Sequence, residues 1–306
     1  MVNITHKNTT LRKAKAQAIV KVSSEKTLTA IRENRVPKGN IHEMAKAAAL
    51  FAVKRTSDMI PDCHPLPVEY CHVHSEILNN EIVIAVEVQT VYKTGAEVEA
   101  MHGVSVAALT MYDMLKPLDK HIEITGIRLL EKSGGKSDFV KKEITGIKAA
   151  VIVCSDSVAK GKKEDRAGKK IIEKLSRHQI EIADYIIIPD ETMLIREKAQ
   201  YYASLNLNLV IFTGGTGLSP RDVTPEALEQ VLEKRIPGIE EALRNYGQQR
   251  TPYSMLSRSM AGLINKTLVL ALPGSTRGAE ESMDAIIPEV FHIFRVMEGA
   301  RHESVT

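Results

Sequence analysis

A strictly alternating segment, residues 81–92, places the strongest constraint on the fold of this chain. Every second position carries a branched apolar residue: Ile82, Ile84, Val86 and Val88. Successive side chains of a strand point to opposite faces, so the pattern predicts a strand with this apolar set on one face. Residues 68–74 also favour a strand, and Asn79–Asn80 tolerates the positive φ of a tight turn. We therefore expect an antiparallel hairpin.

Segments with helical spacing precede and follow this hairpin. Apolar residues recur at helical intervals in 27–33, 41–54 and 97–116, and a proline follows the last of these segments. Residues 7–21 and 122–130 favour strands. This mixture of helices and antiparallel strands predicts an α+β, ferredoxin-like domain over residues 1–142.

Continuous apolar runs replace the alternation in the second half. They cover 149–154, 207–212 and 268–272, with a further strand expected at 181–188 and a helix at 168–177. Runs of this kind are typical of strands buried on both faces of a parallel sheet. The second half is therefore predicted to be an α/β three-layer domain with a mostly parallel sheet. It would cover residues 147–306, after a short charged linker at 141–148.

Composition agrees with two folded domains. The chain has 306 residues, of which 43% are hydrophobic and 26% charged, which is enough for about two domain cores. No apolar run of about 18 residues occurs, and the start of the chain does not resemble a signal peptide. We therefore expect a soluble cytoplasmic protein without membrane contact. Three cysteines without a Cys-x-x-Cys pair predict reduced thiols.

The formal net charge of +3 is too small for a nucleic-acid partner. Such a partner needs a concentrated basic face, and single-stranded bases need aromatic platforms. This chain has 4% aromatic residues and no tryptophan. An anionic small molecule fits the balance better.

Residues 93–137 combine groups that suit proton transfer with groups that suit phosphate binding. The stretch contains paired carboxylates, an Asp three residues before a Lys, and a Gly-Gly turn between two lysines. The residues are Glu97, Glu99, Asp113, Lys116, Lys132 and Lys136. Carboxylates beside amines move protons, and glycine turns flanked by lysine hold phosphate, so we expect half of an active site here. For Asp113 and Lys116 the alternative is an exposed helix ion pair worth roughly 0.2–0.5 kcal/mol.

Three further positions are candidates outside that stretch. Arg12 lies on the predicted strand 7–21. Its side chain could face a ligand, or it could belong to a solvated charged edge of the sheet. Lys38 stands at the tip of a Pro-Lys-Gly loop, where a merely solvated lysine is the ordinary case. His64 lies in a segment stiffened by three prolines, which favours a functional role over that of a core histidine.

A metal-dependent hydrolase is a further possibility. Its ligands would come from Cys63, His64, Cys71, His72 and His74. Adjacent residues of a strand face opposite sides, so Cys71, His72 and His74 cannot all bind one ion. Ordinary sheet side chains are therefore the preferred interpretation.

Four motifs in order resemble those of one family. They are Asp58-Met-Ile-Pro-Asp-Cys-His-Pro-Leu-Pro, Thr94-Gly-Ala-Glu-Val-Glu-Ala, Val104-Ser-Val-Ala-Ala-Leu-Thr-Met-Tyr-Asp-Met and Leu129-Leu-Glu-Lys-Ser-Gly-Gly-Lys-Ser. From about Asn3 to Phe139 the chain is similar to cyclic pyranopterin monophosphate synthases of the MoaC type. The resemblance implies conversion of a 3′,8-cyclised dihydro-GTP into cyclic pyranopterin monophosphate with release of pyrophosphate. It implies no tightly bound cofactor.

This resemblance also implies roles for the candidate residues. Lys38 and Lys116 would act as acid and base, with Asp113 orienting or deprotonating. Glu97 and Glu99 would grip the guanine-derived ring. The phosphates would be held by Arg12, His64, Lys132 and Lys136.

The loops that follow the strands of the second half form another candidate site. The carboxyl ends of parallel strands meet at one crevice, which brings Asp156, Asp190 and Asp222 close to the loop 213–217. The glycines of that loop could cradle an anion, or merely allow tight packing. They are Gly214, Gly215 and Gly217.

With Arg221-Asp-Val-Thr-Pro behind them, these glycines resemble the molybdopterin-binding family of the MoaB/MogA type. The similarity covers about Ile147 to Arg301. It implies that the second half adenylylates molybdopterin with Mg-ATP, with Asp190 and Asp222 holding Mg²⁺. Other family members lack this step, so the alternative is a non-catalytic pterin-binding or assembly module.

Together the two resemblances imply a fusion of two enzymes of molybdenum cofactor biosynthesis. Further pterin or nucleotide contacts would come from Ser257–Arg258 and Pro273–Thr276, unless these segments are structural turns. Both families form closed oligomers, so we expect a homo-oligomer, either a trimer or a hexamer. Its partners would be pterin and nucleotide substrates and other enzymes of the pathway.

Overall fold

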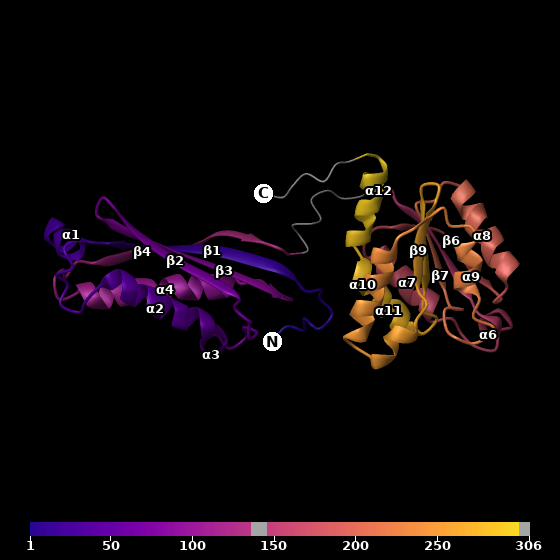
Figure 1. The fold of residues 1–306 in the computed structure, drawn as a ribbon, viewed down its shortest axis with the longest axis horizontal. Coiled ribbons are helices and arrows are strands. Elements are labelled where there is room, and N and C mark those ends of the chain that lie inside the picture. The colour runs from indigo at the N-terminus through magenta and orange to yellow at the C-terminus, as the bar shows by residue number, and fades with distance from the viewer. Residues whose placement is uncertain (136–145, 300–306) are drawn as a thin grey trace. The chain divides into compact units, whose positions relative to one another are not determined.

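The computed structural model describes residues 1–135 and 146–299 of the chain. The chain divides into two compact units, Met1–Lys141 and Lys142–Thr306 (Figure 1). Lys136 and most of the expected linker lie outside the described residues. The domain boundaries at 142 and 147 therefore stay predictions.

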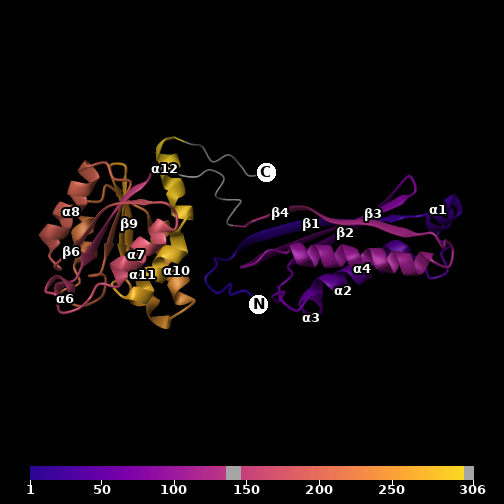
Figure 2. The same cartoon turned by 180° about the vertical axis from the view of Figure 1, so that it is seen from behind.

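The first unit is a four-stranded antiparallel sheet with its two long helices on one face (Figure 2). Its elements are β1 (Thr10–Lys21), α1 (Glu25–Arg32), α2 (Ile41–Lys54), α3 (Thr56–Met59), β2 (Tyr70–Leu78), β3 (Glu81–Tyr92), α4 (Glu97–Leu115) and β4 (Glu123–Ser133). The strand order is β2-β3-β1-β4. The α+β class is confirmed, and so is the hairpin of β2 and β3, with Asn79 at a φ of 57° in its turn.

Small residues let α4 lie close to the sheet and to α2. The four apolar residues of the alternating set in β3 are fully buried beneath the helices. A Cβ atom on Gly103 of α4 would lie 2.7 Å from a methyl carbon of Val53 in α2 and 3.2 Å from one of Val86 in β3. Only a residue without a side chain allows this approach, because protein interiors are close-packed.

Strand β1 lies inside the sheet, paired with β3 on one side and β4 on the other. Arg12 on this strand is only 8% exposed. The solvated charged edge that the segment also suggested is therefore wrong. The position of a strand in its sheet depends on distant pairing partners, which the segment's own pattern does not contain.

The second unit is a six-stranded sheet between two layers of helices. Its elements are β5 (Lys148–Cys154), α6 (Asp156–Ala159), α7 (Ala167–Ser176), β6 (Glu181–Ile188), α8 (Thr192–Ser204), β7 (Leu209–Thr213), α9 (Thr224–Glu229), β8 (Lys234–Arg235), α10 (Pro237–Gln248), η1 (Pro252–Leu256), β9 (Met260–Ile264), β10 (Thr267–Leu272), α11 (Thr276–Ile286), η2 (Glu289–Phe291) and α12 (His292–Met297).

The strand order in this sheet is β6-β5-β7-β10-β9-β8. Strands β6, β5, β7 and β10 are parallel, and β9 runs antiparallel to both its neighbours. Helices α8 and α9 cover one face, and α7, α10, α11 and α12 the other (Figure 1). The predicted three-layer α/β class is confirmed. None of the described helices is both long and apolar enough to cross a membrane.

Asp119 joins the end of α4 to the segment that follows β1. Its carboxylate accepts hydrogen bonds from the backbone N–H of Ser23 at 2.7 Å, the hydroxyl of Ser23 at 2.6 Å and the N–H of His121 at 3.0 Å. Burial alone would raise the pKa of this carboxyl, but these hydrogen bonds outweigh it and hold the pKa below its ordinary value. The ionised side chain therefore fixes the end of the unit at which α1 begins.

We predict that Asp119→Ala lowers the free energy of unfolding of the first unit by about 2 kcal/mol, because it removes a buried acceptor shared by two backbone N–H groups and a hydroxyl. Calorimetry would show the first unit's transition at a lower temperature and the second unit's transition unchanged. Glu123→Ala, which removes an exposed carboxylate from the same unit, is the matched control. Equal shifts for both variants would contradict this role of Asp119.

Candidate functional sites

The structure brings Lys38, Asp113 and Lys116 together at the carboxyl end of α4. The Asp113 carboxylate lies 2.5 Å from the ammonium of Lys38 and 2.8 Å from that of Lys116. The Lys38 ammonium also donates to the backbone oxygen of Asp113 at 2.9 Å. One carboxylate therefore bridges two cations, an arrangement that goes beyond the i,i+3 pair of an ordinary exposed helix.

These contacts set the protonation states in the cluster. Hydrogen bonds from Lys116 and Lys38 lower the pKa of Asp113 to about 2. The hydrogen bond to Asp113 raises the pKa of Lys116 above its ordinary value. Lys116 is therefore protonated at neutral pH, and Asp113 stays an anion that orients both ammonium groups.

The paired glutamates lie at the opposite end of α4, in its first turn. Glu97 pairs with Lys132 of β4 at 3.1 Å. Glu99 is only 2% exposed, and its Oε1 accepts a hydrogen bond from the Cys63 thiol at 3.3 Å. Its Oε2 has no hydrogen-bond partner among the described residues. Burial raises the pKa of Glu99, because the charged form is poorly solvated there.

Two further predicted phosphate ligands, Arg12 and His64, lie at this same end. Arg12 donates through Nε to the backbone oxygen of Tyr92, the last residue of β3, at 3.3 Å. The Gly-Gly turn packs directly on β1, since a Cβ atom on Gly134 would lie 1.7 Å from the backbone oxygen of Leu11. His64 follows the cysteine that contacts Glu99, whereas Lys136 lies outside the described residues.

The two groups of predicted residues are thus far apart within one chain. Fourteen positions of α4 separate Glu99 from Asp113, which at 1.5 Å per residue is about 21 Å along the helix axis. A substrate atom held by one group cannot be within hydrogen-bond reach of the other.

In the second unit, Asp156 and Asp190 lie at the ends of neighbouring parallel strands. The N–H of Asp156 donates to Asp190 Oδ2 at 3.0 Å, and the N–H of Asp190 donates to Asp156 Oδ1 at 3.3 Å. Arg221 also pairs with the Asp156 carboxylate, at 2.6 Å. Asp190 Oδ1 is buried and has no partner in the described part of the chain. Burial raises the pKa of Asp190.

The glycine loop touches both predicted metal-binding carboxylates. A Cβ atom on Gly215 would lie 2.9 Å from Asp190 Oδ1, and one on Gly217 would lie 2.9 Å from Asp222 Oδ2. Gly214 has a φ of 105°, and a Cβ there would lie 2.1 Å from the backbone oxygen of Cys154. The loop therefore has no room for larger residues and brings its backbone against the carboxylates.

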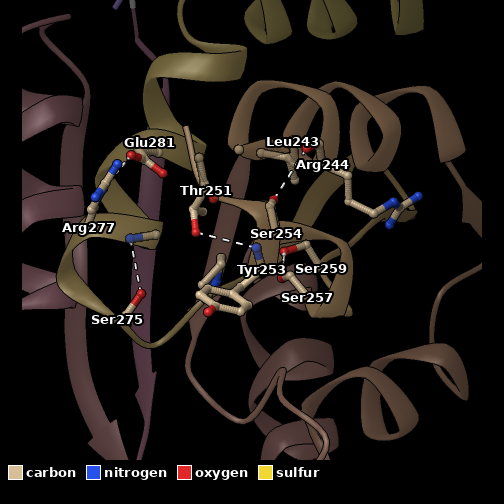
Figure 3. Close-up of a pocket in the computed structure, with 14 residues that line it drawn as sticks. Leu243, Arg244, Thr251, Tyr253, Ser254, Ser257, Ser259, Ser275, Arg277 and Glu281 are labelled. Carbon is tan, nitrogen blue, oxygen red and sulfur yellow. Dashed lines mark hydrogen bonds and ion pairs between the residues drawn. The ribbon is translucent and has the colours of Figure 1, made fainter. Parts of the chain in front are cut away.

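The second unit also contains a pocket of about 320 Å³ (Figure 3). Helix α10 and η1 line one side, and the first turns of α11 line the other (Figure 3). Ser275 caps α11 by accepting a hydrogen bond from the N–H of Gly278 at 3.1 Å. The pocket adjoins the glycine loop, since a Cβ atom on Gly274 would lie 2.9 Å from the Cα of Gly214.

Sequence patterns missed most of this pocket, including Arg244, Tyr253 and Arg277. These residues come from three elements and share no motif spacing. Arg258, considered as a ligand contact, instead donates to the backbone oxygens of Gly217 at 2.8 Å and Asp222 at 2.6 Å. It therefore holds the loop in place.

No group of three or more His, Cys, Asp or Glu side chains in the described ranges is arranged to hold a metal ion. Strand β2 sends Cys71 toward the helices, while His72 and His74 are exposed. The structure gives the zinc-hydrolase alternative no support.

The fold and the clustered side chains thus define a protein of two units, each with its own groups of charged side chains. Comparisons with known proteins agree with this division. The family described as MoaC family matches residues 1–135, and the family described as probable molybdopterin binding domain matches residues 150–292.

The molybdenum cofactor biosynthesis bifunctional protein of Chlorobaculum tepidum is 38% identical over 302 residues, which cover 99% of this chain and 96% of that protein. A cyclic pyranopterin monophosphate synthase of Syntrophomonas wolfei is 46% identical over 145 residues, covering 47% of this chain and 92% of its own length. The solved molybdopterin biosynthesis enzyme MoaB of Thermus thermophilus is 36% identical, with a TM-score of 0.48, over 52% of this chain and 100% of its own. The chain belongs to the family of bifunctional molybdenum cofactor biosynthesis proteins.

We predict that Asp190→Asn raises the free energy of unfolding of the second unit by about 1 kcal/mol at neutral pH, because it removes a charge that burial disfavours. A folded-state pKa above the ordinary value penalises the charged form. The gain should therefore be full above the folded-state pKa and should vanish below pH 3.8, the ordinary value.

Calorimetry across this pH range measures the effect. Glu197→Gln, an exposed carboxylate in the same unit, is the control and should change nothing. A loss of stability in Asp190→Asn, or a gain that is the same at every pH, would contradict the assignment.

Proposed function

We propose that the first unit converts 3′,8-cyclised dihydro-GTP into cyclic pyranopterin monophosphate and pyrophosphate. The observation that carries this proposal is the carboxylate of Asp113 bridged between Lys38 and Lys116. Membership of the MoaC family supports it, since relatives of this half are named cyclic pyranopterin monophosphate synthases.

In this proposal each group has a distinct part. Lys116 donates a proton as the purine ring opens, and Asp113 orients it. Glu97 and Glu99 hold the guanine-derived ring. A substrate hydroxyl attacks the α-phosphorus and loses its proton to the departing pyrophosphate as the bond to the β-phosphate breaks, so that pyrophosphate leaves with the remaining negative charge. Arg12, His64 and Lys132 stabilise that charge, and Lys136 is predicted to join them.

The proposal requires a homo-oligomer. The ring that Glu99 holds is also the part that exchanges protons, yet Asp113 lies about 21 Å from it in the same chain. We infer that Lys38, Asp113 and Lys116 of one copy act on a ring held by the glutamates of another. A closed trimer or hexamer would build such a site at each contact between copies.

Mixed oligomers test this inference. Lys116→Ala and Glu99→Gln should each be inactive alone, but copies of the two variants in random mixture should regain about one quarter of wild-type turnover, because one site in four receives both intact groups. Product formation after mixing and reassociation is the measurement. Lys116→Ala mixed with Asp113→Ala is the control and should stay inactive, since both changes lie at the same end of α4. If the mixture of Lys116→Ala and Glu99→Gln were as inactive as the control mixture, a site shared between copies would be contradicted.

For the second unit we propose transfer of AMP from Mg-ATP to molybdopterin. Asp190 and Asp222 would hold Mg²⁺, which neutralises phosphate charge when bound. The unpartnered Asp190 Oδ1 fits a cation ligand. The adjoining pocket, with Ser275 and Arg277 at the start of α11, would receive the pterin and its phosphate. A non-catalytic assembly module has no need of a carboxylate oxygen that is buried without a partner, so the catalytic function is favoured.

We predict that Asp222→Asn lowers AMP transfer from ATP to molybdopterin at least about 100-fold, because a carboxylate beside the phosphates is lost. Incorporation of labelled AMP into molybdopterin is the measurement. Glu197→Gln should keep full activity. Equal inactivity of the wild type and Asp222→Asn would leave the second unit as a binding module.

A further inference from the structure

The thiol of Cys63 and the buried carboxyl of Glu99 form a hydrogen-bonded pair. The Cys63 sulfur lies 3.3 Å from Glu99 Oε1, and its other nearby acceptor is the backbone oxygen of His64, at 3.8 Å. The cysteine sits in a turn closed by its own N–H, which donates to the backbone oxygen of Ile60 at 3.0 Å. Two prolines follow at positions 65 and 67 and stiffen the segment.

Glu99 is the acceptor in this pair, and its two oxygens have different surroundings. The residue is 2% exposed, so water does not solvate the carboxyl. Oε1 accepts from the thiol, whereas Oε2 has no hydrogen-bond partner among the described residues. A buried acceptor without a donor is costly unless a ligand supplies one, so the orphan oxygen points to a ligand N–H.

We propose that Cys63 is a positioning residue for substrate: its S–H holds Oε1 of Glu99, so that Oε2 is left to accept an N–H of the guanine-derived ring. This inference rests on the proposed function of the first unit. It adds to that function a positioning role for Cys63, the cysteine of the proline-rich segment.

The thiol acts here as a donor and not as a nucleophile. Burial, followed by the nearby charge of Glu99, raises the pKa of Cys63 to about 11. The sulfur therefore keeps its proton at neutral pH, as a donor must. Glu97, the other carboxylate in this turn of α4, pairs with Lys132 and is not the acceptor.

Kinetics of three variants test the positioning role. Cys63→Ala should lower kcat/KM about tenfold, mainly through a higher KM, because the ring-binding carboxyl loses its donor. Cys63→Ser keeps a donor and should recover most of that loss. Cys71→Ala removes a half-buried thiol of the same unit and should leave both constants unchanged. Wild-type kinetics in Cys63→Ala, or equal damage in Cys63→Ser, would overturn the proposal.

A second measurement needs no turnover and separates this inference from the proposed function. Alkylation of each cysteine across pH, followed by peptide mass spectrometry, should place the Cys63 midpoint near pH 11 in the wild type. In Glu99→Gln it should move toward the ordinary value of 9.0, while that of Cys71 stays in place. A wild type without turnover contradicts the proposed function alone. An unmoved Cys63 midpoint contradicts the pair, whatever the activity.

Discussion

The close approach of α4 to its neighbours is the contact on which the first unit depends. Gly103 leaves no space for a Cβ atom between Val53 of α2 and Val86 of β3. Because the helix is packed this tightly, its two ends have fixed positions. The first turn carries Glu97 and Glu99, and the last turn carries the Asp113 carboxylate, which pairs with two lysines. The length of one helix therefore determines how far apart these two groups lie.

The two units share one feature although their folds differ. Each has a carboxyl with one oxygen hydrogen-bonded and the other buried without a partner in the described structure, Glu99 in the first unit and Asp190 in the second. Such groups lower the stability of the folded state, and they are retained where a ligand supplies the missing donor or cation. In the second unit the donor is a backbone N–H at a strand end, and in the first it is a thiol. The same physical principle thus operates at the end of a parallel sheet and in the first turn of a helix.

Local patterns predicted the strands and the longer helices of the first unit, because periodicity reports directly which face of a strand or helix is buried. In the second unit they predicted the four parallel strands and α7, but not α8 to α12 or the antiparallel strand β9. They placed the hairpin of β2 and β3 and the strand ends that carry Asp156 and Asp190. They could not place Arg12, whose burial depends on strand order, or the pocket lined by Arg244 and Arg277, which three elements form together. The separation along α4 was available from the sequence, since the predicted helix 97–116 already puts Glu99 and Asp113 at opposite ends. Treating the candidate residues as one site concealed it.

We infer that a lone chain cannot assemble the site of the first unit. Lyase activity per chain as a function of protein concentration, measured with the mass distribution of the same solution, tests this inference most directly. Turnover should fall in proportion as oligomers dissociate, because a single copy keeps Glu99 and Asp113 about 21 Å apart. Monomers with full turnover would contradict it.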